Sequence, residues 1–133
     1  MLPTDLAWVM NGKRCEAFLG RIPRDATITD IGSRTAKQYS NLIQCSKMVF
    51  TNGPMGIFEQ AETELGTRVI WDALSLTEAY TVVGGGDSIA AVTKFGRTEK
   101  ISYICTGGGA LIRFLTGEEL PVVRALRYAA KVF

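Results

Sequence analysis

The stretch that decides the fold spans residues 81–96 and reads TVVGGGDSIAAVTKFG. An apolar run typical of a β-strand precedes three glycines, and a segment with helical spacing of its apolar residues follows them. Glycine is costly in regular structure because it loses the most backbone freedom on folding. A second triplet occurs in the same setting at 107–109, within ISYICTGGGALIRFL (101–115). The repeat indicates two strand-to-helix turns of one kind.

Strands and helices alternate on both sides of the triplets. The pattern predicts strands at 48–50, 80–83 and 101–105, each followed by a glycine-bearing turn and a helix. Such alternation is typical of a parallel sheet. Right-handed crossovers then place all three turns at one edge of that sheet, where open α/β sheets bind their ligands. We therefore predict an α/β fold, a Rossmann-like three-layer α/β/α arrangement with a mostly parallel sheet.

The N-terminal part predicts a small β-hairpin. Asn11-Gly12 is a strong hairpin signal, flanked by strand-like residues over 7–18. A short strand-like run follows at 26–31, after which Ser33 is expected to cap a helix. Pro121 is expected to open the last helix. The residues expected to face the core from the successive helices are Ala36, Tyr39 and Ile43; Leu65, Val69, Ile70, Ala73 and Leu74; Ile89, Val92 and Phe95; Leu111, Phe114 and Leu115; and Val122, Leu126 and Ala130, with Arg124, Arg127 and Lys131 outward.

The amino-acid composition excludes several classes of function. The chain has 133 residues, 47% of them apolar, and a net charge of +2, so bulk charge gives no reason to expect nucleic acid or membrane binding. The absence of histidine removes His-based nucleophilic catalysis and the commonest metal ligand. The N-terminus lacks the positive region of a secretory signal. The three cysteines are far apart, and we expect Cys15 and Cys45 to be buried, reduced thiols.

The two triplets offer a way to bind an anion. A helix N-terminus presents unpaired N–H groups and the positive end of the helix dipole, and glycine leaves room for a phosphate to approach. A single triplet at the end of a strand is more often simply a tight turn that permits close packing. Two triplets, together with NGPMG (52–56) at the same predicted edge, favour anion binding. Neither triplet matches the dinucleotide or P-loop patterns.

Each of two carboxylates near these turns has two possible roles. Asp87 follows the first triplet directly, where it could cap the helix or bind a phosphate-bound Mg²⁺. Glu59 could be a solvated charge in the first turn of a helix or an acceptor for a ribose hydroxyl. The residue pattern alone does not choose between these roles.

Several stretches together resemble phosphoglycerate kinase. They are NGPMGIFE (52–59), TVVGGGDS (81–88), SYICTGGGA (102–110) and ELP (119–121), supported by LPTD (2–5) and DIG (30–32), with matching order and spacing. The resemblance covers residues 1–133 and is to the C-terminal part of that family's nucleotide-binding domain. It implies an enzyme that transfers a phosphoryl group between 1,3-bisphosphoglycerate and ADP with Mg²⁺, giving 3-phosphoglycerate and ATP in glycolysis.

The resemblance also implies roles for individual residues. Glu59 would hold the nucleotide ribose, and Pro54 and Ile57 would line the adenosine pocket. Asp87 would bind the magnesium ion. The groups that would face the transferring phosphoryl group are Gly85, Gly108 and Gly109. The full set implied for nucleotide binding is Asn52, Pro54, Ile57, Glu59, Gly85, Gly86, Asp87 and Ser88.

Some departures from the family pattern bear on activity. Cys105 stands where the family usually has Ser, Tyr103 where it often has His, and Thr51 where Trp is common. The family's lysine-bearing glycine loop has no match, and neither has the N-terminal domain through which 1,3-bisphosphoglycerate or 3-phosphoglycerate would bind. We therefore expect a partial domain of a cytoplasmic, usually monomeric enzyme, inactive as an isolated chain. The alternatives are a standalone adenine-nucleotide or phosphate-binding module and a fragment that folds only against a partner.

Overall fold

The N-terminal part of the chain folds into a small antiparallel sheet. The computed structural model describes residues 1–132, and its first strands are β1 (Asp5–Met10), β2 (Lys13–Phe18) and β3 (Ile28–Ile31), in the order β2-β1-β3. Asn11 and Gly12 have φ of 51° and 69°, which a two-residue type I′ turn requires. The predicted hairpin is confirmed. The short run before Gly32 is also a strand, and it adds to the free edge of β1.

The second half of the chain builds a parallel sheet. Its strands are β4 (Met48–Asn52), β5 (Tyr80–Gly84) and β6 (Tyr103–Cys105), in sequential order, with Asn52 opposite Gly84 and Gly84 opposite Cys105. The strands therefore end level with one another. This register brings the residues that follow each strand to one edge, as predicted.

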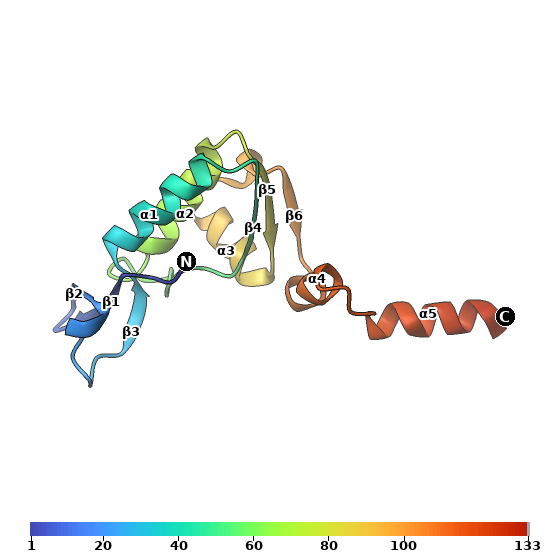
Figure 1. The fold of residues 1–133 in the computed structure, drawn as a ribbon, viewed down its shortest axis with the longest axis horizontal. Coiled ribbons are helices and arrows are strands. Elements are labelled where there is room, and N and C mark those ends of the chain that lie inside the picture. The colour runs from blue at the N-terminus through green and yellow to red at the C-terminus, as the bar shows by residue number, and fades with distance from the viewer. Residues whose placement is uncertain (133) are drawn as a thin grey trace.

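Five α-helices accompany the two sheets in the described part of the chain: α1 (Ser33–Gln44), α2 (Leu65–Leu76), α3 (Gly86–Lys94), α4 (Gly108–Leu115) and α5 (Pro121–Val132). Short 3-10 turns occur at η1 (Leu19–Arg21) and η2 (Thr98–Lys100). In Figure 1, α1 and α2 lie side by side between the small sheet and the parallel sheet, and α5 extends away from the body. None of the helices in residues 1–132 is long and apolar enough to cross a membrane.

One face of the parallel sheet carries the core. Val83 of β5 is fully buried against α2 and α3, because consecutive right-handed crossovers in one direction place both helices on the same face. The opposite face is contacted by α4 near Gly84, where Leu111 and Phe50 meet. Layers of helix, sheet and helix are thus present at the glycine edge, in a partial α/β domain. The buried cluster comprises Ile43, Phe58, Ile70, Trp71, Ala73, Leu74, Val83 and Ala91.

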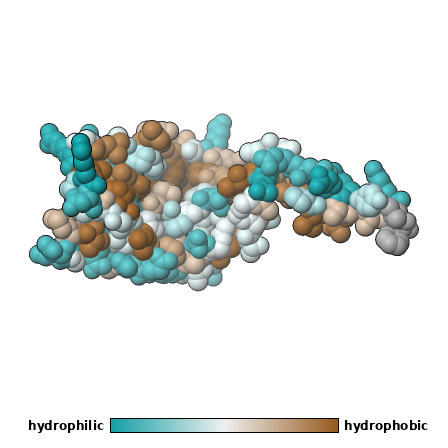
Figure 2. Space-filling view, turned by 90° about the horizontal axis from the view of Figure 1, so that it is seen from below, coloured by the Kyte–Doolittle hydropathy of each residue, from teal (hydrophilic) through white to brown (hydrophobic). Residues whose placement is uncertain are grey.

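The C-terminal helices differ from the sequence prediction. Val122 and Leu126 of α5 are 70% and 66% exposed, so the prediction that they face inward is wrong. Phe114 and Leu115 of α4 are exposed as well. Their helical spacing is real, but no described element lies against them, and periodicity alone cannot supply the opposing surface. Figure 2 shows the apolar side chains along one side of the protruding helix.

Candidate functional site: the glycine edge of the parallel sheet

The three turns after β4, β5 and β6 meet at one point. A Cβ on Gly85 would lie 2.7 Å from Asn52 Oδ1, and one on Gly108 would lie 3.0 Å from the Cα of Gly85. The amide of Gly85 also donates a hydrogen bond to the carbonyl of Cys105 (3.1 Å). Side chains have no room at these two glycines. The predicted convergence of the turns is therefore confirmed, with the Asn52 amide placed between two of them.

Glycine rather than a polar side chain begins the helices at this edge. The N-cap of α3 is Gly85, whose φ of 92° disfavours any residue with a Cβ, and the N-cap of α4 is Gly107. Asp87 lies inside the first turn of α3 and does not cap it, so the capping interpretation of Asp87 is wrong. Within residues 1–132, neither N-cap residue closes its helix with a side-chain hydrogen bond. The N–H groups of these first turns are suited to bind an anion.

Ser88 links the start of α3 to the turn that follows β4. Its side chain is fully buried, and its hydroxyl oxygen accepts a 2.6 Å hydrogen bond from the amide of Gly53. Gly53 itself has a φ of 97°. Ser88 therefore fixes the chain that leaves β4 against the start of α3. Its buried position leaves the edge itself to backbone groups and to exposed side chains.

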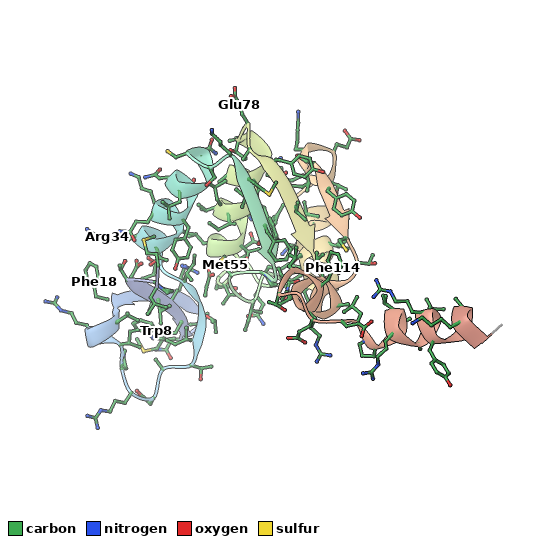
Figure 3. The ribbon with its side chains drawn as sticks, turned by 45° about the vertical axis from the view of Figure 1, so that its right-hand side comes forward. Trp8, Phe18, Arg34, Met55, Glu78 and Phe114 are labelled. Atoms are coloured by element: carbon green, nitrogen blue, oxygen red, sulfur yellow. The ribbon has the colours of Figure 1, made fainter. Side chains whose placement is uncertain are left out.

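The loop after β4 carries the residues that the resemblance assigns to the nucleoside. Pro54 is half-buried, while Ile57 and Glu59 are exposed. The amides of Met55 and Gly56 both donate to the Thr67 hydroxyl of α2 (3.1 and 3.2 Å). In Figure 3, Met55 lies between the small sheet carrying Trp8 and the α4 helix carrying Phe114. The loop thus spans the gap between the two sheets at the level of the glycine edge.

Asp87 is the carboxylate that the first glycine turn places at this edge. It is exposed, in the first turn of α3. The described residues contain no group of three or more His, Cys, Asp or Glu side chains that could hold a metal ion by themselves. A single carboxylate can bind a hard cation such as Mg²⁺ only if the bound ligand and water supply the other oxygen atoms that coordinate the ion. The residues present fit a metal that arrives with a phosphate.

The other two helix starts of the body are closed by carboxylates that the sequence analysis missed. The amides of Arg34 and Thr35, at the start of α1, donate to the Asp5 carboxylate (3.1 and 2.7 Å), and the Ser33 amide donates to Glu16 (2.9 Å). The Gly66 amide of α2 donates to Asp30 (2.7 Å). The small sheet therefore supplies the caps of the two helices packed beside it.

The two buried aspartates differ in their protonation behaviour. Burial works to raise the pKa of Asp5, but hydrogen bonds from the Thr35 hydroxyl and from the amides of Thr35 and Arg34 outweigh it and lower the pKa. Burial also raises the pKa of Asp30, and there the Gly66 amide and Arg14 only partly offset it. Arg14 pairs with Asp30 at 2.9 Å and donates to the Ile31 carbonyl at 2.8 Å.

The cysteines are free thiols. Cys45 is exposed at the end of α1, so the prediction that it is buried is wrong, and Cys15 is only partly buried. Cys105 is partly buried as well, and its sulfur lies 3.7 Å from where a Cβ on Gly107 would stand. The side chain at 105 therefore borders the second glycine turn.

The fold and this edge define a class: an α/β protein whose parallel strands end level, with glycine-built helix starts at their carboxyl ends, an arrangement suited to phosphate-bearing ligands. Comparison with known proteins then gives the family. The family model described as phosphoglycerate kinase matches residues 1–118, and the chain belongs to that family.

Relatives and solved structures agree with this assignment. The chain is 45% identical to phosphoglycerate kinase of Pyrococcus abyssi over 98% of its own length and 33% of that relative. It is 41% identical to the Thermoplasma volcanium enzyme, over 100% of its length and 32% of that enzyme. The Coxiella burnetii phosphoglycerate kinase structure superposes with a TM-score of 0.84 at 34% identity, covering 98% of this chain and 34% of that one. The chain spans about a third of the length of the curated relatives it matches.

Proposed function

We propose that residues 1–133 form the C-terminal part of the nucleotide-binding domain of a phosphoglycerate kinase. The whole enzyme would carry out Mg²⁺-dependent transfer of a phosphoryl group from 1,3-bisphosphoglycerate to ADP, giving 3-phosphoglycerate and ATP in glycolysis. The acyl phosphate substrate would bind through the part of the enzyme that residues 1–133 do not cover. The enzyme would be cytoplasmic and monomeric. Family membership supports the assignment to a phosphoglycerate kinase, and the chain covers about a third of each relative.

The phosphate end of the nucleotide is assigned to the two glycine turns. The amides of Gly86, Asp87 and Ser88 in the first turn of α3 would donate to nucleotide phosphate oxygens, with Gly85 allowing close approach and the Asn52 side chain lying between the turns. The Gly109 amide would face the phosphoryl group during transfer, next to the backbone of Gly85 and Gly108, whose amides are paired with the carbonyls of Cys105 and Thr106. Phosphoryl transfer needs fixed donors and positioned partners more than a covalent nucleophile, which suits a chain without histidine.

The metal and the nucleoside are assigned to the flanking residues. Asp87 would hold the magnesium ion, which when bound neutralises charge on the phosphate oxygens. Pro54 and Ile57 would line the adenosine pocket, and Glu59 would accept a hydrogen bond from the ribose. Glu59 and Asp87 are both exposed, so neither requires rearrangement of the core to reach a ligand. These roles leave the buried carboxylates of the small sheet with a purely structural task.

The observation that carries the proposal is the meeting of Asn52, Gly85 and Gly108. A Cβ at Gly85 would press on the Asn52 side chain at 2.7 Å and one at Gly108 on the Gly85 backbone at 3.0 Å, so glycine at both positions keeps backbone groups accessible at this edge. Two helix starts of the body, α3 and α4, point their positive ends into the same region. Such a cradle recognises the di- or triphosphate group of a nucleotide.

Calorimetric titration of the 133-residue chain with ADP tests the proposal. We expect binding in the presence of Mg²⁺, and we expect Asp87→Ala to weaken that binding roughly tenfold, which corresponds to about 1.4 kcal/mol. In EDTA, Asp87→Ala should bind ADP at least as well as the wild type, because without Mg²⁺ the carboxylate repels the phosphates. Glu99→Ala, another exposed carboxylate removed from this edge, serves as the control. No ADP binding by the wild type would contradict the nucleotide site, and equal Mg²⁺-dependent affinities would contradict the role of Asp87.

A second candidate is a nucleotide-binding module without turnover, favoured by the chain's coverage of only a third of its relatives. A coupled assay with 1,3-bisphosphoglycerate and ADP separates the two. We expect residues 1–133 by themselves to form no ATP, because they cover only about a third of the enzymes they match and proximity requires that both substrates be held. ATP formation by the isolated chain would contradict its incompleteness as an enzyme. If a longer chain that includes the rest of the enzyme also binds ADP but forms no ATP, the result would favour the module.

A further inference from the structure

The loop between β4 and α2 has no regular secondary structure from residue 53 to residue 64. Its backbone groups therefore need partners from elsewhere, since an unpaired buried carbonyl is costly. One such partner is Lys94, whose ammonium group donates a 2.5 Å hydrogen bond to the carbonyl of Phe58. Phe58 is also buried in the core through its ring. Phe58 thus anchors the loop by both its side chain and its backbone.

Lys94 reaches this carbonyl from a particular place. It is the last residue of α3, the helix whose first turn forms the proposed phosphate site. The same ammonium group pairs with Glu64 at 2.8 Å, and the Glu64 side chain is 9% exposed and also pairs with Arg68. The ammonium group also lies 5.6 Å from the centroid of the Phe95 ring. One helix therefore touches the phosphate region at its start and the loop at its end.

Glu59 lies between fixed neighbours. Phe58 is held as described, and the Thr63 hydroxyl donates to the carbonyls of Ile57 and Gln60. The Thr63 amide also donates to Gln60 (3.2 Å). The Glu59 side chain itself is exposed. The backbone on both sides of Glu59 is therefore set by buried contacts, while its carboxylate stays free to meet a ligand.

We infer that Lys94 is a positioning residue for nucleoside binding: it fixes the Glu59-bearing loop relative to α3, and hence relative to the phosphates bound at the other end of that helix. This inference rests on the proposed nucleotide site. Because Lys94 holds the loop and makes no contact with the phosphate turns, its loss should affect recognition of the nucleoside and spare recognition of the phosphates.

The test compares ADP with pyrophosphate, which has the phosphates but no nucleoside, in titrations of the full 133-residue chain with Mg²⁺. Lys94→Met keeps an unbranched side chain of similar size but removes the donor and the charge, and Glu64 keeps Arg68 as its partner. We expect ADP affinity to fall roughly tenfold, the effect of losing one charge-assisted hydrogen bond. Pyrophosphate affinity should not change. Lys100→Met, at an exposed lysine of η2, is the matched control and should bind both like the wild type.

Hydrogen exchange adds a readout that needs no ligand. In Lys94→Met, amides at 57–63 should exchange faster, while those of β5 and the body of α3 stay as in the wild type. If Lys94→Met does not fold, Lys94→Arg keeps the charge beside Glu64 with an altered reach to the Phe58 carbonyl, and the same ADP-selective loss is expected.

Equal ADP affinity of the folded variants and the wild type would overturn the inference alone. A parallel loss of ADP and pyrophosphate affinity would overturn it too, because it would show a general structural effect. A wild-type chain that binds neither ligand would overturn the proposed function itself and this inference with it.

Discussion

Helices α1 and α3 begin in opposite ways. At α1, three successive amides are occupied by the carboxylates of Asp5 and Glu16, which the small sheet supplies. At α3, the start is built from glycine, and the cap residue Gly85 has no side chain to close it. The same contrast holds between α2, capped by Asp30, and α4, which starts at Gly107. A helix start carries the same positive end in each case.

The difference separates structural helix starts from the ones that we propose to be functional. Where the chain uses its own carboxylates, the positive end is neutralised internally and helps hold the two sheets together. Where it uses glycine, the positive end is left for an external anion. The contrast explains why the small sheet belongs to the architecture of the site, although none of the residues assigned to the ligand lies in it.

Removal of a carboxylate that caps a helix start should give the largest loss of stability. Asp30→Ala leaves Arg14 without its 2.9 Å partner and the Gly66 amide without its acceptor. Arg14 keeps Glu16 and the Ile31 carbonyl as partners, so the cost comes mainly from the buried Gly66 amide that loses its acceptor, and we expect the free energy of unfolding to fall by about 2–3 kcal/mol. Urea denaturation measures it. Asp25→Ala, at an exposed aspartate of the same region, should stay within about 0.5 kcal/mol of the wild type. Similar losses of unfolding free energy in both variants would contradict the capping role of Asp30.

A pair of substitutions within one triplet tests the open start of α3. Gly85→Ala places a Cβ 2.7 Å from Asn52 Oδ1 at a positive φ, and should cost about 1–2 kcal/mol of stability. Gly86→Ala meets no atom within 4 Å and should be neutral or stabilising by up to about 1 kcal/mol. Thermal unfolding of both variants checks this ranking. Equal stabilities would show that the cradle tolerates side chains and is not shaped by close approach.

The capping of α1 by Asp5 should make stability depend on pH, with a smaller effect than the substitutions above. Its folded-state pKa lies below the ordinary value of 3.8, so its contribution is fully present above that pH and is lost as pH falls through the folded-state pKa. At neutral pH, Asp5→Asn should therefore be less stable than the wild type by about 1 kcal/mol, the net value of a hydrogen bond. The difference should shrink below pH 3.8. A difference that does not change with pH would rule out the carboxylate charge as its cause.

Much of the frame could be predicted from local sequence. The hairpin at Asn11-Gly12 is specified by two adjacent residues that tolerate positive φ, and the alternation of apolar strands with glycine turns specifies the parallel sheet. The meeting of the turns follows from crossover handedness alone. These features depend on the chain's neighbours in sequence or on rules that hold for every parallel sheet.

The features that were missed depend on contacts between distant segments. Asp5 and Asp30 cap helices only because β3 pairs with β1 and brings both strands beside α1 and α2, and neither pairing is visible in a sequence pattern. Gly85 replaces Asp87 as the cap of α3 because Asn52 and Gly108 crowd that position. For α5, the helical spacing of Val122 and Leu126 was read correctly, but no described element provides the surface that they were expected to face.

Amide chemical shifts of the ¹⁵N-labelled chain on addition of ADP and Mg²⁺ test the central claim most directly. The account predicts that Gly85, Gly86, Gly108 and Gly109 shift, while the carboxylate-bound amides of Ser33, Thr35 and Gly66 do not. Shifts concentrated at α1 and α2, or spread evenly over the four helix starts, would contradict it.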